Sequence, residues 1–137
     1  MKSTSGIYFI FLFFIFIGYN TSAQTYKDCN TDGHIFVHTE KAPKYKGQLQ
    51  NYFEDAFKGD ALAYTGEIIT IFIIDEDGRC CCTDIQKCDS ASLSAKLKDA
   101  IDRMPGWKPA VQNGHVVRFY FRLKFSFNGS DFRVTPM

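Results

Sequence analysis

The chain has little proline, almost no net charge and no long apolar run. Its four prolines are scattered rather than clustered, so the sequence contains no proline-rich spacer. Its 16 basic and 15 acidic residues nearly cancel. A near-neutral domain has no general electrostatic attraction for nucleic acid or for an anionic membrane. We therefore expect neither of them as a partner.

Enzyme signatures are missing as well. The sequence shows no Ser-His-Asp order, no phosphate-binding loop and no paired-acid motif. His115 opens a predicted strand without an identifiable carboxylate partner, and we interpret His34 and His38 as surface residues. The acids at 75–77 lie in a predicted turn, where solvation accounts for them. We expect no catalytic residue, no cofactor and no metal.

The N-terminus carries an apolar run that is too short to cross a membrane. Ile7 to Ile17 is eleven residues long, whereas a spanning helix needs about 20. Lys2 precedes this run and Thr21-Ser22-Ala23 follows it, which is the pattern of a cleaved secretion signal. We expect residues 1–23 to be removed, so that Gln24 begins the mature chain. An uncleaved membrane anchor is the alternative.

Five cysteines remain after cleavage: Cys29, Cys80, Cys81, Cys82 and Cys88. Export permits disulfides, and because five is an odd number, at least one thiol stays free or pairs outside the chain. Neighbouring residues on a strand point to opposite faces, so the three consecutive thiols could face one metal only across a β-bulge. We expect core thiols and one disulfide of unknown connectivity, with Cys80 buried as a small hydrophobe.

Hydrophobic spacing predicts an α+β domain in the order α-β-β-α-β. Apolar stripes indicate helices at 47–57 and 92–104, the second capped by Asp89, Ser90 or Ser92. Strands are expected at 68–74 and 79–87, joined by a turn at Asp77-Gly78. A strictly alternating segment predicts a last strand at about 115–127. Residues 24–34 are expected to form a flexible leader and residues 129–137 a tail.

One segment carries a family resemblance. The stretch Met104-Pro105-Gly106-Trp107-Lys108-Pro109-Ala110, followed by Asn113-Gly114 and the alternating strand, resembles the C-terminal domain of TonB. TonB is the periplasmic energy transducer of Gram-negative outer-membrane transport. The upstream pieces Phe36-Val37, Glu40 and Pro43-Lys44-Tyr45-Lys46-Gly47 are similar to the lead-in of Bacteroidetes-type members. The resemblance covers residues 35–128, nearly the whole mature chain.

The resemblance implies a fold and a function. The fold is a three-stranded antiparallel sheet packed by two helices, in which Pro105, Trp107, Pro109, Asn113 and Gly114 are structural residues. The function is protein binding in the periplasm: the last strand offers a free edge to an extended segment of an outer-membrane transporter, the TonB box, by β-augmentation. The implied edge residues are Val117, Arg118, Phe119, Tyr120, Phe121, Arg122 and Leu123.

The chain departs from a full transducer by the missing proline-rich spacer and the short, cleavable apolar run. It also has an abbreviated link at Gly59–Thr65, without the Tyr-Pro that relatives usually carry there. The resemblance therefore implies a stand-alone binding module rather than a complete energy transducer. Membrane contact is expected only if residues 1–23 stay attached, with the domain then facing the periplasm. The sequence does not decide whether the protein forms a homodimer. The alternative function is an exported scaffold for thiols that exchange disulfides or capture a metal.

Overall fold

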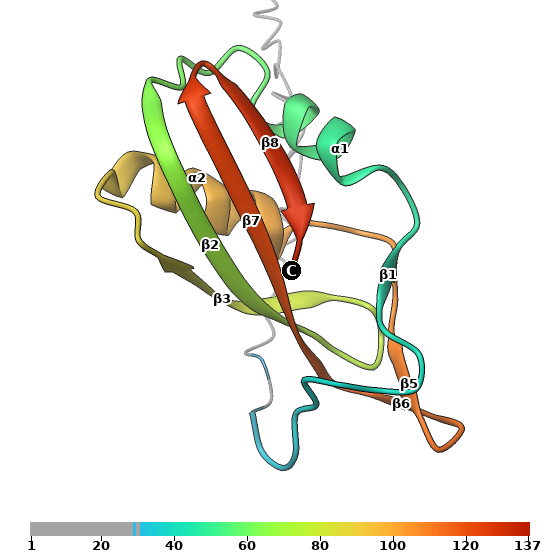
Figure 1. Cartoon of the computed structure of the whole chain (residues 1–137). Helices are drawn as coiled ribbons and strands as arrows, with labels where there is room; N and C mark the ends of the chain where they lie inside the picture. Colours follow the sequence, from blue (N-terminus) through green and yellow to red (C-terminus); the bar gives the residue numbers. More distant parts are fainter. Residues whose placement is uncertain (1–28, 30) are drawn as a thin grey trace, which may run out of the picture.

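The computed structural model describes residue 29 and residues 31–137, and its centre is an antiparallel sheet of four strands in the order β3-β2-β7-β8 (Figure 1). Two small two-stranded sheets, β1-β4 and β5-β6, lie beside it. The elements are β1 Lys44–Tyr45, α1 Leu49–Ala56, β2 Tyr64–Ile74, β3 Cys80–Gln86, α2 Ala91–Asp102, β4 Trp107–Lys108, β5 Ala110–Gln112, β6 His115–Val117, β7 Phe119–Gly129 and β8 Asp131–Pro136. The predicted α+β class with two helices is confirmed.

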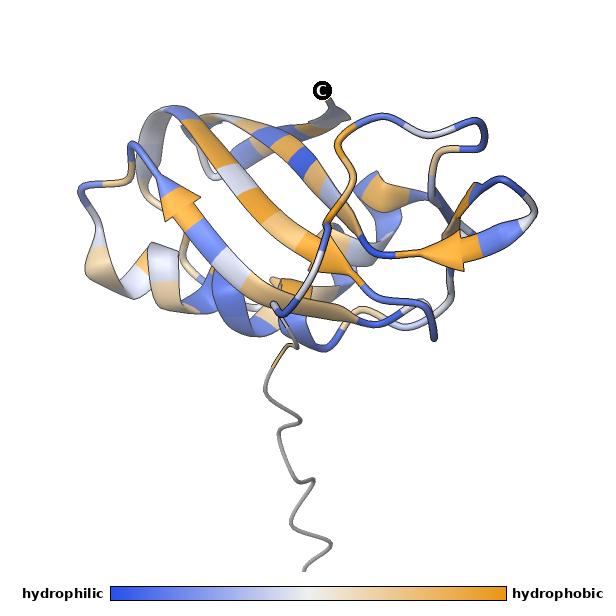
Figure 2. Cartoon of the chain, turned by 90° about the horizontal axis from the view of Figure 1, so that it is seen from below, coloured by the Kyte–Doolittle hydropathy of each residue, from blue (hydrophilic) through white to orange (hydrophobic). Residues whose placement is uncertain are grey.

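The core lies between the two helices and one face of the sheet. Phe53 of α1 is fully buried and meets Phe125 of β7 edge to face, with ring centroids 4.8 Å apart. From α2, Leu97 enters the same cluster. Apolar and polar residues alternate along β7, because successive side chains of a strand point to opposite faces, whereas the central β2 is apolar over most of 68–74 (Figure 2).

Both helices begin and end near their predicted limits. Of the three candidate caps of α2, the structure uses Ser90, whose hydroxyl accepts a hydrogen bond from the Leu93 amide at 3.3 Å. The Tyr52 hydroxyl of α1 donates to the Ala100 carbonyl of α2 at 2.6 Å and so joins the helices. Burial raises the pKa of Tyr52 to about 12, because an apolar environment disfavours the phenolate.

The predicted hairpin at Asp77-Gly78 is confirmed. The Asp75 carboxylate accepts from the amides of Asp77 and Arg79, both at 2.9 Å, and closes the turn. Gly78 has φ +77° and lies directly against the backbone of Trp107: a Cβ at this position would sit 2.1 Å from the Trp107 carbonyl oxygen. Only glycine fits there, since the position demands both a left-handed backbone and the absence of a side chain.

Trp107, which the resemblance implies is a structural residue, closes one end of the core. Its side chain is only 3% exposed. Its ring lies against Phe121 of β7 with centroids 4.8 Å apart, and it also contacts the rings of Tyr45 and Phe72. The burial agrees with a structural role for the Pro105–Pro109 segment.

Two predictions about the sheet were wrong. The main sheet has four strands rather than three, because residues 131–136 of the expected tail reverse after Gly129 and pair with β7 as β8. The expected single strand at 115–127 is divided at Arg118. Its first part is β6, which forms a separate hairpin with β5. The turn of that hairpin is Asn113-Gly114, where both residues have positive φ, as a two-residue type I′ turn requires.

Within the described part of the chain, no helix is long and apolar enough to cross a membrane. The predicted signal at 1–23 lies outside the described residues. Residues 24–28 and 30 of the predicted leader lie outside them as well.

Candidate functional site

The strand expected to offer a free edge is an interior strand. β7 pairs with β2 along its whole length, from Tyr64↔Gly129 to Ile74↔Phe119. On its other side it pairs with β8, from Leu123↔Pro136 to Asn128↔Asp131. The expectation of a free edge at 115–127 was therefore wrong.

The upstream part of the outer side of β7 is also occupied, by the N-terminal segment and by the last residue. The Phe36 amide donates to the Arg118 carbonyl at 3.0 Å, and the Tyr120 amide donates to the Phe36 carbonyl at 2.9 Å. The Met137 amide donates to the Arg122 carbonyl at 3.2 Å. The backbone positions that a peptide would use are thus taken by β8 from Leu123 to Asn128 and in part by these three hydrogen bonds between Arg118 and Arg122.

The seven residues expected at the edge fall into four groups. Phe119 and Leu123 are buried in the core and Phe121 packs against it, whereas Val117 belongs to β6. Tyr120 and Arg122 face solvent, and Tyr120 is 40% exposed. Arg118 holds other parts of the chain: its guanidinium lies 3.4 Å from the Glu76 carboxylate and donates to the Asp32 carbonyl.

Among the described residues, one side chain that the sequence analysis did not identify covers the outer edge of β8. Gln50 of α1 donates from Nε2 to the Phe132 carbonyl at 2.9 Å, and its Oε1 accepts from the Val134 amide at 3.0 Å. The amide group therefore takes the place of one residue of a neighbouring strand. Such blocking of exposed strand edges prevents uncontrolled pairing with other chains.

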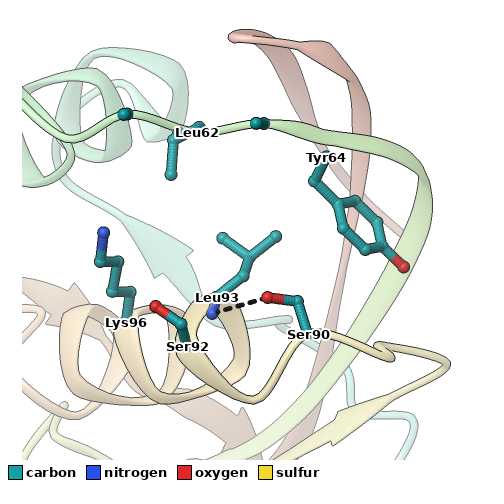
Figure 3. A pocket seen from close by; sticks show the side chains of 8 residues that line it. Leu62, Tyr64, Ser90, Ser92, Leu93 and Lys96 are labelled. Atoms are coloured by element: carbon teal, nitrogen blue, oxygen red, sulfur yellow. Dashed lines mark hydrogen bonds between the residues drawn. The ribbon is translucent and has the colours of Figure 1, made fainter.

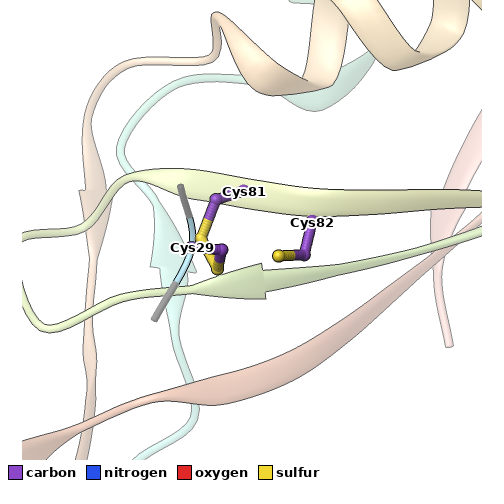
Figure 4. A group of neighbouring side chains, drawn as sticks. All are labelled: Cys29, Cys81 and Cys82. Carbon is purple, nitrogen blue, oxygen red and sulfur yellow. A yellow bond between two sulfur atoms is a disulfide. The ribbon is translucent and has the colours of Figure 1, made fainter. Parts of the chain in front are cut away.

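Three of the five cysteines meet beside β3, and we call Cys29, Cys81 and Cys82 the sulfur site (Figure 4). Cys29 and Cys81 form a disulfide with their Cα atoms 5.4 Å apart, and Cys82 carries a free thiol. All three sulfur atoms lie within 4.8 Å of one another. Cys82 is exposed and Cys81 is buried. Among the described residues this is the only cluster of potential metal ligands, and it contains no histidine.

A β-bulge brings the neighbouring Cys81 and Cys82 together. The β2–β3 register shifts between Ile71 and Ile73, so that Cys82 and Thr83 face the single residue Phe72. Cys82 has φ +51°, which is unusual for a residue other than glycine. The sequence indicated that consecutive thiols could share a face only across a bulge, and the structure has one. The contribution of Cys29 was not foreseen, because sequence does not encode disulfide connectivity.

The other two cysteines are separate from the sulfur site. Cys80 is buried in the core, as predicted, and burial raises the pKa of its thiol strongly. Cys88 is half-buried, and its thiol donates to the Ser90 carbonyl at 3.3 Å. Three consecutive cysteines therefore have three environments: a core thiol, a disulfide and an exposed thiol.

A small cavity lies where the start of β2 meets the N-terminus of α2 (Figure 3). Its volume is about 160 Å³, and Leu62, Tyr64, Leu93 and Lys96 are among its lining residues. Small-molecule sites usually measure about 300–1,000 Å³. The Ser90 hydroxyl at its rim is already used as the cap of α2. We assign no ligand to this cavity.

No family model matches the chain, and no curated protein or solved structure shows significant similarity to it.

Proposed function

We propose that the mature domain is a periplasmic protein-binding module that captures an extended peptide segment by strand addition to β7, in the manner of TonB C-terminal domains. The observation that supports this is the position of β8. It occupies the side of β7 on which the resemblance places the peptide. On this proposal the peptide takes the place of β8, and the domain holds its own C-terminal strand there until a partner arrives.

Three features make β8 suitable as a strand that can be exchanged. It is short, spanning Asp131–Pro136, and within the part of the chain that the structure describes it pairs with β7 alone. Its outer edge is held by one side chain, that of Gln50. An incoming segment would reuse the same β7 backbone groups, so the exchange replaces hydrogen bonds rather than losing them.

The side chains of β8 set the requirement on the peptide. Val134 is 7% exposed, and Phe132 packs on the core through ring contacts with Phe57 and Phe127 at 5.7 and 5.5 Å. Burying a side chain of this size contributes about 1.5–3 kcal/mol. A peptide that replaces β8 must therefore bring apolar residues at two alternate positions. Because it competes with β8, we expect micromolar or weaker binding.

The partner that fits this role is an extended segment of an outer-membrane transporter. The proposal is limited to binding, since the sequence shows no proline-rich spacer that would reach across the periplasm.

The experiment is an NMR titration of the mature protein, residues 24–137, with a TonB-box-like peptide. We expect shifts at 123–128 and across β8. Gln50→Ala removes two hydrogen bonds to β8, each contributing about 0.5–1.5 kcal/mol, and should tighten peptide binding by about 5- to 150-fold. Gln48→Ala is the matched control, because the Gln48 side chain contacts Asn51 rather than β8. Shifts confined to other regions, or equal affinities of the two variants, would contradict the proposal.

A second candidate function, a thiol scaffold, is favoured by one observation, the free thiol of Cys82 beside a disulfide.

A further inference from the structure

We propose that the sulfur site is a thiol–disulfide exchange site, in which Cys82 competes with Cys81 for Cys29. The protein would then exist in two forms with the same number of disulfides. One form carries the Cys29–Cys81 bond described above, and the other carries a Cys29–Cys82 bond. This inference does not depend on peptide binding by β7.

The first argument is proximity. Exchange requires a thiolate to reach a disulfide sulfur, and the Cys82 sulfur lies within 4.8 Å of both sulfurs of the bond. In a regular strand the side chains of two successive residues point to opposite faces. Here the bulge at Cys82, with its left-handed backbone, gathers both sulfurs on one side of β3. A left-handed conformation is unfavourable for a residue other than glycine, and the fold nevertheless adopts it at this cysteine.

The second argument is exposure. Cys82 is the exposed member of the site, so its thiol can lose its proton to solvent and attack. Cys80, two positions earlier, provides the contrast within the same strand. It is buried and its pKa is raised, which keeps it as an unreactive thiol. The difference in burial therefore separates a reactive cysteine, Cys82, from an unreactive one, Cys80.

The step is balanced without any oxidant or reductant. Cys82 gives its proton to water, and the Cys82 thiolate attacks the Cys29 sulfur. The Cys29–Cys81 bond breaks, the Cys29–Cys82 bond forms, and Cys81 leaves as a thiolate that takes a proton from water. Attack on the Cys81 sulfur instead would join sequence neighbours. Their Cα atoms are about 3.8 Å apart, below the roughly 4.4–6.8 Å of most disulfides.

The exchange changes which thiol the protein displays. With Cys29 bound to Cys81, the free thiol is exposed; with Cys29 bound to Cys82, the free thiol belongs to Cys81, which is buried in the structure. The site therefore presents or withdraws one reactive thiol. In both forms, Cys29 anchors the segment that runs on to Phe36 and β7.

Disulfide mapping of the mature wild-type protein tests this directly. The oxidised protein is incubated at pH 8 without reductant, quenched with acid and its free thiols are alkylated. Trypsin places all three consecutive cysteines in one peptide, Cys80–Lys87, so fragment ions can assign the free thiol. We expect both Cys29–Cys81 and Cys29–Cys82. Their interconversion should be independent of protein concentration and accelerate with pH as the thiolate fraction grows.

Two variants provide the controls. Cys82→Ser should contain the Cys29–Cys81 bond alone, and Cys88→Ser, which alters a thiol outside the site, should map like the wild type. The proposal is overturned if the wild type retains only Cys29–Cys81 after prolonged incubation. It is equally overturned if Cys29–Cys82 appears at a rate proportional to protein concentration, since the exchange would then be intermolecular.

Discussion

Gly78 offers a quantitative test of how the turn after β2 is built against Trp107. Replacing it by alanine has two costs. The left-handed backbone, with φ +77°, disfavours a side chain by about 1–2 kcal/mol. The new Cβ would also stand 2.1 Å from the Trp107 carbonyl oxygen, and relieving such overpacking costs about 1–3 kcal/mol.

Gly114 separates the two costs. Its φ of +75° is nearly the same, but a Cβ there would meet nothing within 4 Å. We expect Gly114→Ala to lower the free energy of unfolding by about 1–2 kcal/mol, and Gly78→Ala to lower it by about 2–5 kcal/mol. Stabilisation through the lower entropy of the unfolded chain occurs in both variants, so it cancels in the comparison.

The assay is urea unfolding followed by the fluorescence of the single tryptophan. A total stability of about 5–15 kcal/mol is typical of a domain, so Gly78→Ala should still fold and give a measurable midpoint. Equal losses in the two variants would refute the close contact between the turn and Trp107.

Three further expectations follow from the structure and the sequence. Trp107→Ala should lower the free energy of unfolding by about 3–5 kcal/mol, the usual range for a buried large aromatic residue; because this variant has no tryptophan, its urea unfolding is followed by circular dichroism, and a loss below about 1 kcal/mol would speak against its place in the core. Cys80→Val should preserve the fold, judged by circular dichroism and the urea midpoint, because Cys80 acts as a small hydrophobe; an unfolded variant would contradict this. Mass spectrometry of the exported protein should find Gln24 at the N-terminus, whereas an intact Met1 in the membrane fraction would favour the anchor.

The local elements were predictable from the sequence because their signals are local. The apolar stripes at helical spacing located α1 and α2 to within a few residues. The Asp77-Gly78 turn located the β2–β3 hairpin for the same reason. Asn113-Gly114 is an equally strong hairpin signal. The alternating segment that follows it predicted one continuous strand, so the interruption at Arg118 between β6 and β7 was not foreseen.

The pairing of distant segments was not predictable in the same way. An interior and an edge strand can share one pattern, so the alternation of 115–127 did not reveal that β8 covers β7. The six residues of β8 alternate polar residues with Phe132 and Val134, but the segment is short and ends at Pro136, so its pattern is too brief to assign a strand from sequence alone. The Cys29–Cys81 pair spans 52 residues, and the bulge that gathers the sulfur site arises from the register of β3 against β2. These features depend on the assembled sheet.

Amide hydrogen exchange with and without peptide tests the central proposal most directly. In the free protein, the amides of Arg133 and Thr135 lie opposite Ser126 and Lys124 in the β7–β8 ladder and should be protected. On saturation with a TonB-box-like peptide, we expect protection to be lost at Arg133 and Thr135 but retained at Lys124 and Ser126, because the peptide replaces β8 on β7. If the peptide binds while Arg133 and Thr135 stay protected, it binds elsewhere and the strand-exchange account is wrong.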